Sequence, residues 1–255
     1  MLTFSLQSGS NGNCIYVETG GVRLLFDAGI NGIQAEKKLA ARGCSIRDID
    51  AVIISHDHGD HIRHAGIFQR KYGLPLHVTR KTLAIAEKRH PLGRLHDVHH
   101  FYPGGFMDFG TVRVHAIPTP HDGAEGSVFV VASGEKRLGI MTDLGHVFDG
   151  LEEVISTLDA VFIESNYDTD MLARGPYPAF LKKRITGPEG HISNAEAAEL
   201  LKPASSGKLK WVCLAHLSEQ NNKASLAIET HRKVLPPSLP LYIASRYAPS
   251  DMLNV

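Results

Sequence analysis

The stretch His56-Asp57-His58-Gly59-Asp60-His61 places three imidazoles and two carboxylates within six consecutive positions. It follows Ala51-Val52-Ile53-Ile54, a short β-branched run that predicts a buried strand. His56 and His58 are two residues apart, so in extended backbone their side chains point to the same face. Gly59 permits a turn that lets Asp60 and His61 approach from another direction. The spacing favours a centre for two metal ions over a merely polar loop of hydrogen-bonded histidines.

Three other apolar runs also end close to a residue that can bind metal. His121 comes after the run 112–117, Asp143 after 138–141 and His216 after 211–215. A single histidine after a strand is usually a surface residue, but four such strand ends can meet at one edge of a sheet. The set offers imidazole nitrogen and carboxylate oxygen and no thiolate, which suits two divalent ions, Zn²⁺ or Mn²⁺.

Short strands alternating with helices are expected along the whole chain. Apolar runs bounded by Gly, Pro, Asp or Asn predict the strands, with hairpin turns at 18–21 and 133–136. The alternation predicts an α/β architecture, two mixed sheets with helices on the outside, in one domain over residues 1–255. The strands are predicted at 14–17, 22–26, 51–54, 76–78, 112–117, 128–131, 138–141, 160–163, 211–214 and 241–243. The helices are predicted at 34–42 (closed by Gly43), 79–90 (capped by Thr79), 194–202 (capped by Asn194) and 224–235 (stopped by Pro236).

Composition gives weaker limits on partners and compartment. Lys+Arg and Asp+Glu are both 27, so zero net charge gives no global support for nucleic-acid binding, although a local basic groove stays possible. The three cysteines, Cys14, Cys44 and Cys213, form no CxxC pair and are expected to be reduced thiols. No signal-peptide pattern and no run of membrane-spanning length is found, which predicts a cytoplasmic protein with no membrane partner.

The order of the candidate ligands resembles the metallo-β-lactamase superfamily. Its HxHxDH signature stands at 56–61 and is followed by a histidine, an aspartate and a histidine. The resemblance implies an αββα four-layer sandwich and hydrolysis by a hydroxide held between two ions, with no Ser or Cys nucleophile. It implies one ion on His56, His58 and His121, a second on Asp60, His61 and His216, and Asp143 bridging both. The Asp at 143 departs from lactamases that use a cysteine ligand, which favours the phosphodiesterase and thioesterase branches.

Further segments resemble a narrower family, the YycJ/WalJ-type metallohydrolases. They are Ser8–Cys14, Pro120–Glu125, Glu164–Asp168, Gly190–Asn194 and Ala215–Asn222. The resemblance implies 5′-to-3′ exonuclease activity on double-stranded DNA with manganese or zinc. This chain carries Tyr167 where the family usually has His, a departure that bears on the substrate more than on the chemistry.

Two other functions remain open. A small-molecule phosphodiesterase, acting on a cyclic nucleotide or a sugar phosphate, would use the same chemistry and agrees with the neutral net charge. A thioesterase of the glyoxalase II type would use the same fold, but those enzymes usually add a C-terminal helical domain, and only about forty residues follow His216.

Several residues outside the seven ligands are candidates for contact with the substrate. Asp60, itself a ligand, and His191 are predicted to be catalytic, His191 by contacting the scissile phosphate or protonating the leaving oxygen; a histidine that only caps the following helix is the alternative. The loop 8–13, with Ser10 and Asn11, could offer backbone N–H groups to phosphate or be only a tight turn. Asn166, Arg174 and the basic run 182–184 are further candidates for binding. Asp27 is expected to orient a ligand.

Overall fold

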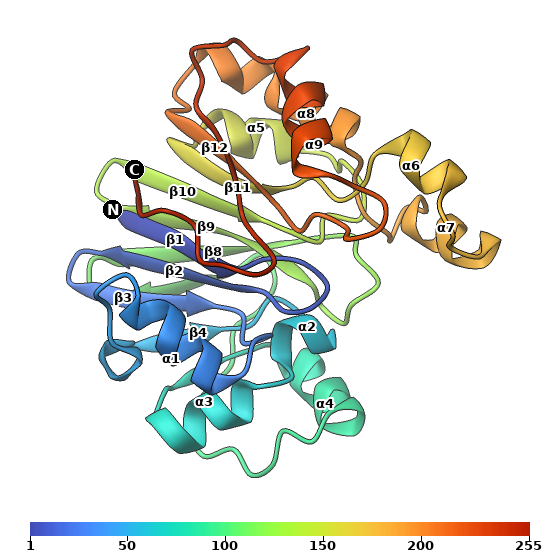
Figure 1. Cartoon of the computed structure of the whole chain (residues 1–255). Coiled ribbons are helices and arrows are strands. Elements are labelled where there is room, and N and C mark those ends of the chain that lie inside the picture. The colour runs from blue at the N-terminus through green and yellow to red at the C-terminus, as the bar shows by residue number, and fades with distance from the viewer.

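Two seven-stranded sheets lie face to face in the computed structural model (Figure 1), which describes residues 1–255 apart from the side chain of Ser206. In spatial order, the first sheet contains β14 (Leu253–Asn254), β1 (Leu2–Gln7), β2 (Cys14–Thr19), β3 (Val22–Phe26), β4 (Ala51–Ile53), β5 (Leu76–His77) and β6 (Val98–His99). The second contains β13 (Leu241–Ile243), β12 (Trp211–Ala215), β11 (Ala160–Glu164), β10 (Lys136–Met141), β9 (Ser127–Ser133), β8 (Val112–Pro118) and β7 (Phe106–Phe109).

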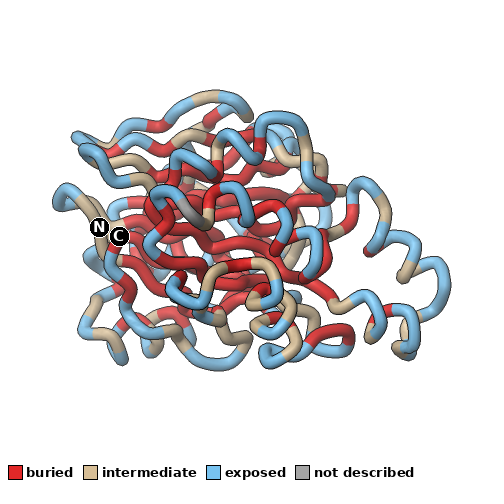
Figure 2. Tube along the Cα trace, turned by 90° about the horizontal axis from the view of Figure 1, so that it is seen from above, coloured by how far each residue is buried: buried red, intermediate tan, exposed pale blue. Residues whose placement is uncertain are grey.

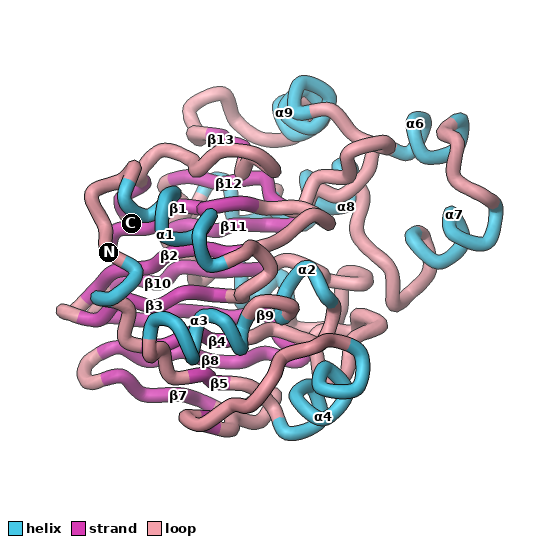
Figure 3. The backbone as a smooth tube through the Cα atoms, turned by 60° about the horizontal axis from the view of Figure 1, so that its bottom comes forward, coloured by secondary structure: helices cyan, strands magenta, loops and turns pink.

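Helices cover the outer faces of both sheets (Figure 3). Those over the first sheet are α1 (Gly32–Ala40), α2 (Gly59–Ile62), α3 (Ala65–Tyr72) and α4 (Arg80–Arg89), with the short 3₁₀ helix η1 (Ile46–Asp48). Those of the second half are α5 (Leu151–Ser156), α6 (Thr169–Arg174), α7 (Ala179–Ile185), α8 (Asn194–Leu201) and α9 (Ala224–Arg232), with η2 (Pro203–Ser206). Of these, α6 and α7 project from the body of the protein. Among the described residues, no helix is long and apolar enough to cross a membrane.

The strands bury side chains on both faces. In β2, Ile15 and Val17 enter the core between the sheets, whereas Cys14 and Tyr16 enter the core under α1 and α3. This alternation follows from the two-residue period of a strand. A third core lies between the second sheet and α5, α8 and α9, and Figure 2 shows buried chain through the middle of the molecule. The predicted αββα sandwich is confirmed, and the single domain, which the core shared by both sheets supports, stays a prediction.

The sheets are built so that several parallel strands end at one edge. Strands β3 to β6 pair in parallel in the first sheet, and β10 to β13 do so in the second. Both chain termini lie at the opposite edge, as Figure 1 shows by the positions of N, C and α2. The loops after the parallel strands therefore gather on the side of α2.

Several local expectations needed correction. Helix α8 is capped by Ser193 and not by Asn194, because Glu196 three residues on completes a capping box with the Ser193 hydroxyl. Helix α1 ends with Ala41 as its C-cap, two residues before the left-handed Gly43. Both predicted hairpins and the Thr79 cap are confirmed. The remaining elements, among them β1, β7, α3 and α5, lack a clear pattern in the sequence.

Candidate metal centre

The structure brings all seven predicted ligands together at the edge where the parallel strands end. His56 follows β4, Asp143 follows β10 and His216 follows β12 directly, while His121 lies three residues beyond β8. Asp60 and His61 lie on the single-turn helix α2, whose N-cap is His58. Backbone hydrogen bonds from Asn13 to the Asp60 carbonyl and from Ala28 to the His61 carbonyl, both 2.7 Å, hold this turn against the sheet.

His56, His58 and His121, called here the His56 group, can present one nitrogen each to a common point. These nitrogens lie within 4.8 Å of one another. His121 Nδ1 donates to the Gly190 carbonyl (2.7 Å), and His56 Nδ1 lies 2.9 Å from the Ser55 hydroxyl. Both contacts leave Nε2 free to bind a cation, and they fix the orientation of each ring.

Asp60, His61 and His216, called here the His61 group, form a second cluster with the same 4.8 Å spacing. His61 Nδ1 donates to the buried carboxylate of Asp27 (2.7 Å), so the expected contact of Asp27 with a candidate ligand is present. His216 Nδ1 lies 3.1 Å from Glu164 Oε1. In both residues Nε2 is the nitrogen that faces the cluster, with a carboxylate behind the ring. His216 Nε2 has no hydrogen-bond partner among the described residues, whereas His61 Nε2 lies 2.9 Å from Asn13 Nδ2.

Asp143 lies between the two groups. Its Oδ2 is 3.2 Å from His61 Nε2, and its Oδ1 is 3.6 Å from His121 Nε2. A third cluster with ligand spacing, His56, His61 and Asp143, therefore joins one member of each group to the same carboxylate.

Strained backbone marks the same strand ends. Among the described residues, four non-glycine residues have a left-handed φ, and three of them are Asp27 (68°), Asp143 (58°) and His216 (53°). Left-handed backbone costs on the order of 1 kcal/mol or more for such residues and persists where the surroundings impose it. The strain lies at residues whose side chains point into the cluster.

The unpaired atoms of the cluster fit a bound cation. His56 Nε2, His216 Nε2 and Asp143 Oδ2 are buried and have no hydrogen-bond partner within the described part of the chain. Leaving such an atom unpaired costs about 1–3 kcal/mol, and cations bound in the two groups would satisfy all three. Nitrogen and carboxylate ligands without thiolate agree with zinc or manganese.

The pKa values of the histidines shift in opposite directions in the two groups. Burial lowers the pKa of His56, His58 and His121, in spite of the nearby Asp143. Burial also acts on His216, but there Asp143, Asp60 and Glu164 outweigh it and raise the pKa to about 10. The His61 group thus lies in an anionic environment that favours a cation.

Glu164 and Asn13 support the cluster, although no role was predicted for either. The buried Glu164 accepts from His191 Nδ1 (2.7 Å), and its other oxygen accepts from the backbone N–H groups of Leu144 (3.1 Å) and Ile192 (3.2 Å). Asn13 Nδ2 lies 2.9 Å from His61 Nε2. A carboxylate closing the otherwise apolar run 160–163 was the available signal for Glu164. The signal for Asn13 was its place in the loop 8–13.

The residues predicted to contact the substrate differ in burial and in distance from the ligands. His191 is at the centre, with its ring 4.9 Å from that of His121 and its side chain 15 % exposed. Asn166 is buried and donates to the His216 carbonyl (2.8 Å), so the structure places it behind a ligand. Asn11 donates to the Arg246 carbonyl (3.0 Å). Ser10 and Arg174 are exposed, Arg174 on the projecting α6. Their contact with substrate stays a prediction.

The beta-lactamase superfamily domain matches residues 22–213, which include six of the seven ligands. The chain belongs to this superfamily. Exodeoxyribonuclease YycJ of Bacillus anthracis is 35% identical over 90% of this chain and 87% of its own length. Exodeoxyribonuclease WalJ of Streptococcus pneumoniae is 34% identical over 87% of this chain and 83% of its own. At this identity and coverage the chain is a member of the YycJ/WalJ family, as the sequence motifs predicted.

Solved structures of other proteins share the fold. The metallo-beta-lactamase fold protein YhfI from Bacillus subtilis superposes with a TM-score of 0.74 over 98% of both chains, at 17% identity. Zn(2+)-bound PqqB from Methylobacterium extorquens gives 0.72 over 98% of this chain and 100% of its own, at 16% identity. At such low identities the agreement concerns the fold alone.

Proposed function

We propose that this protein is a metal-dependent phosphodiesterase that acts as a DNA exonuclease, degrading duplex DNA from 5′ ends. The observation that carries the proposal is the pair of ligand groups joined by Asp143 in a member of the YycJ/WalJ family. We assign one divalent ion, zinc or manganese, to the His56 group, a second to the His61 group, and Asp143 to both. When bound, such ions supply activation of water and charge neutralisation at a phosphate.

The chain's own residues would orient the substrate and move protons around the ions. Glu164 accepts a hydrogen bond from His191 Nδ1 and fixes the ring, so that Nε2 is the nitrogen available to the substrate. In the imidazolium form of His191, Nε2–H can donate to a phosphate oxygen or give its proton to the leaving oxygen. Burial opposes ionisation of Asp60, but the charges of His61 and His216 lower its pKa to about 2. Asp60 is therefore a carboxylate at neutral pH and can accept a hydrogen bond from the attacking water.

Basic side chains on both sides of the His56 group are candidates for contact with a polyanionic substrate. Arg184 on α7 donates to Asp122 Oδ2 (2.6 Å), and Asp122 Oδ1 lies 3.3 Å from His58 Nε2. Two shallow hollows flank this position. One is lined by Lys183 and Arg184, and the other by Lys81 and Arg89. Carboxylates line the same hollows: Asp122 and Glu189 in both, and Asp57 in the second. Cations on both sides of the cluster suit a phosphate backbone passing over it.

The test is hydrolysis of duplex DNA with one labelled end by protein loaded with Mn²⁺ or Zn²⁺. We expect mononucleotides from the 5′-labelled end, loss of activity in His58→Ala, and normal activity in His96→Ala, which alters an exposed histidine. No release of nucleotides from any DNA would overturn the DNA assignment. Cleavage of bis(p-nitrophenyl) phosphate without cleavage of DNA would then point to a small phosphodiester.

A further inference from the structure

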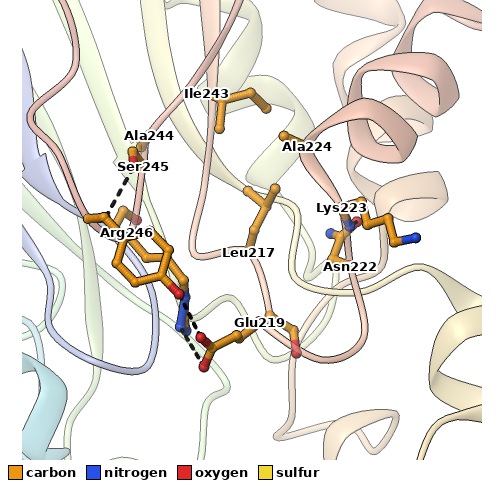
Figure 4. Close-up of a pocket in the computed structure, with 12 residues that line it drawn as sticks. Leu217, Glu219, Asn222, Lys223, Ala224, Ile243, Ala244, Ser245 and Arg246 are labelled. Atoms are coloured by element: carbon orange, nitrogen blue, oxygen red, sulfur yellow. Dashed lines mark hydrogen bonds and ion pairs between the residues drawn. The ribbon is translucent and has the colours of Figure 1, made fainter.

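A cavity of about 290 Å³ lies beside the His61 group (Figure 4). It is enclosed by the loop after β12, the beginning of α9 and the segment after β13. Leu217, which lines it, follows the ligand His216 directly, and Ser8 at its inner side accepts a hydrogen bond from the His216 backbone N–H (2.8 Å). The cavity and the metal centre therefore share a wall.

Positive charge gathers around this cavity. Arg246 and Lys223 both line it, and Lys223 is the N-cap of α9, whose nine residues begin without a side-chain cap. The first N–H groups and the dipole of that helix favour an anion at this end. The Arg246 side chain is 12% exposed, and its buried Nε has no hydrogen-bond partner among the described residues.

The loop 8–13 holds Arg246 in place. Asn11 donates to the Arg246 carbonyl (3.0 Å), and a Cβ at Gly9 would lie 3.2 Å from Arg246 Nη2. Gly9 also has a φ of +137°, which side chains rarely adopt. This part of the Gly- and Ser-rich loop serves to bring the backbone close to the guanidinium.

The rest of the cavity is apolar, with one aromatic ring at its edge. Leu217, Ile243 and Ala224 form the wall, and Tyr247 stands at the mouth, 68% exposed. The Tyr247 hydroxyl donates to Glu219 (2.6 Å). Glu219 also faces Arg246 Nη1 at 3.8 Å, and Figure 4 shows these two side chains pointing toward each other. Glu219 is the negative group at the mouth. The pair that Glu219 forms with Arg246 is long, and the Glu219 side chain is 61% exposed, so the pair is weak and can give way to a phosphate.

We propose that this cavity binds the 5′-terminal nucleotide of the DNA strand. The base would lie against the apolar wall and Tyr247, and the terminal phosphate monoester would lie at Arg246. Lys223, whose side chain extends away from Arg246 in Figure 4, would contribute only as a more distant positive charge. The volume is at the lower end for ligand sites and suits one nucleotide, not a continuing strand. Such a pocket next to the ions places the first phosphodiester bond at the metal centre and restricts cleavage to chain ends. This inference rests on the proposed function.

The experiment compares duplexes with a 5′-phosphate and with a 5′-hydroxyl. Wild-type protein should prefer the phosphorylated end, and Arg246→Gln should lower the ratio of the two kcat/KM values by about tenfold to hundredfold, as for a lost charged hydrogen bond. Lys223→Gln, which changes an exposed side chain, should lower it roughly threefold to tenfold. Lys233→Gln, at the other end of α9, is the matched control. Each variant's hydrolysis of bis(p-nitrophenyl) phosphate corrects for damage to the metal site.

Binding of the mononucleotide dAMP tests the pocket without catalysis. We expect calorimetry to show weaker dAMP binding to Arg246→Gln and Lys223→Gln, and unchanged binding to Lys233→Gln. If both cavity variants keep the wild-type preference and bind dAMP as wild type does, the pocket assignment is wrong while the exonuclease proposal stands. If wild type cleaves no DNA, the proposed function fails, and dAMP binding alone decides for or against the pocket.

Discussion

The His56 group and the His61 group lie at the same edge of the sheets, but the charges around them differ. The three imidazoles of the His56 group have lowered pKa values, with burial as the main cause. In the His61 group, nearby carboxylates overcome burial and raise the pKa of both histidines. The His61 group has its own compensation for a cation, from Asp27, Asp60 and Glu164.

This difference makes the two proposed ion positions unequal. The carboxylate that most favours charge on each imidazole of the His56 group is Asp143, which also contacts the His61 group. Asp122 adds a second, half-exposed carboxylate near His58. An ion in the His56 group therefore depends on a shared ligand, whereas an ion in the His61 group has dedicated anionic support.

Replacing Asp143, the ligand shared by both groups, should affect metal binding in both groups at once. Asp143→Asn removes the negative charge common to both, so we expect loss of at least one bound ion and a fall in kcat/KM of about a thousandfold or more. Metal content by mass spectrometry and hydrolysis of labelled duplex DNA measure the two effects. Asp149→Asn, on an exposed loop nearby, is the control. A variant with two ions and full activity would show that Asp143 is not shared.

Removing the charge of Glu164, which lies behind the His61 group, should weaken metal binding in that group more than in the His56 group. Glu164→Gln keeps the shape but loses the charge that orients His216 and His191. We expect metal affinity of the His61 group to fall about tenfold to hundredfold, with a smaller change at the His56 group. Titration of the metal-free protein with Zn²⁺ would resolve two affinities, and Glu153→Gln on α5 serves as control. Equal weakening at both positions would contradict the comparison.

A smaller loss of metal affinity is expected when the carboxylate beside the His56 group is replaced. Asp122→Asn removes the charge 3.3 Å from His58 Nε2, but this carboxylate is partly exposed and already paired with Arg184. We expect the affinity of the His56 group to fall roughly threefold to tenfold, with the His61 group unchanged. The same Zn²⁺ titration measures it, with Asp108→Asn, in an exposed pair with Arg113, as control. A larger loss at the His61 group would reverse the assignment.

The sequence predicted the ligands well because they are chemically distinctive and follow recognisable strands. The spacing in 56–61 and the later order of His121, Asp143 and His216 contain the information needed to expect two groups. The αββα fold follows from buried runs such as those of β4 and β12, which are continuous in the sequence and fully buried in the structure.

Supporting contacts could not be predicted in the same way, because they join residues far apart in the chain. Glu164 reaches His191 across 27 positions, and Asn13 reaches His61 across 48. Asn166, a candidate for contact with the substrate, is buried and donates to the His216 carbonyl, a contact across 50 positions of the chain. The short β7 and the polar α3 give weak periodicity, so their existence depends on packing that the sequence pattern does not contain.

A histidine outside both groups provides a reference for the effect of carboxylates. His231 on α9 is buried, and its ring donates to the Ala227 carbonyl (2.8 Å). Burial, helped by the charge of Arg232, lowers its pKa from 6.5 to about 4. Without a carboxylate neighbour among these contacts, a buried histidine stays neutral, which is the opposite of His216.

This contrast predicts a small dependence of stability on pH. Because the folded pKa is below the unfolded one, the unfolded chain binds the proton first as the pH falls. The contribution of His231 is complete above pH 6.5 and is lost progressively towards pH 4. Between pH 7 and 5.5 this costs about 1 kcal/mol of the free energy of unfolding. His231→Leu should therefore reduce the dependence of that free energy on pH, as measured by urea unfolding of the metal-free protein. His96→Leu is the surface control. If the free energy of unfolding of His231→Leu depends on pH as it does in the wild type, burial alone does not keep His231 neutral. The contrast between His231 and His216 would then no longer show the effect of the carboxylates.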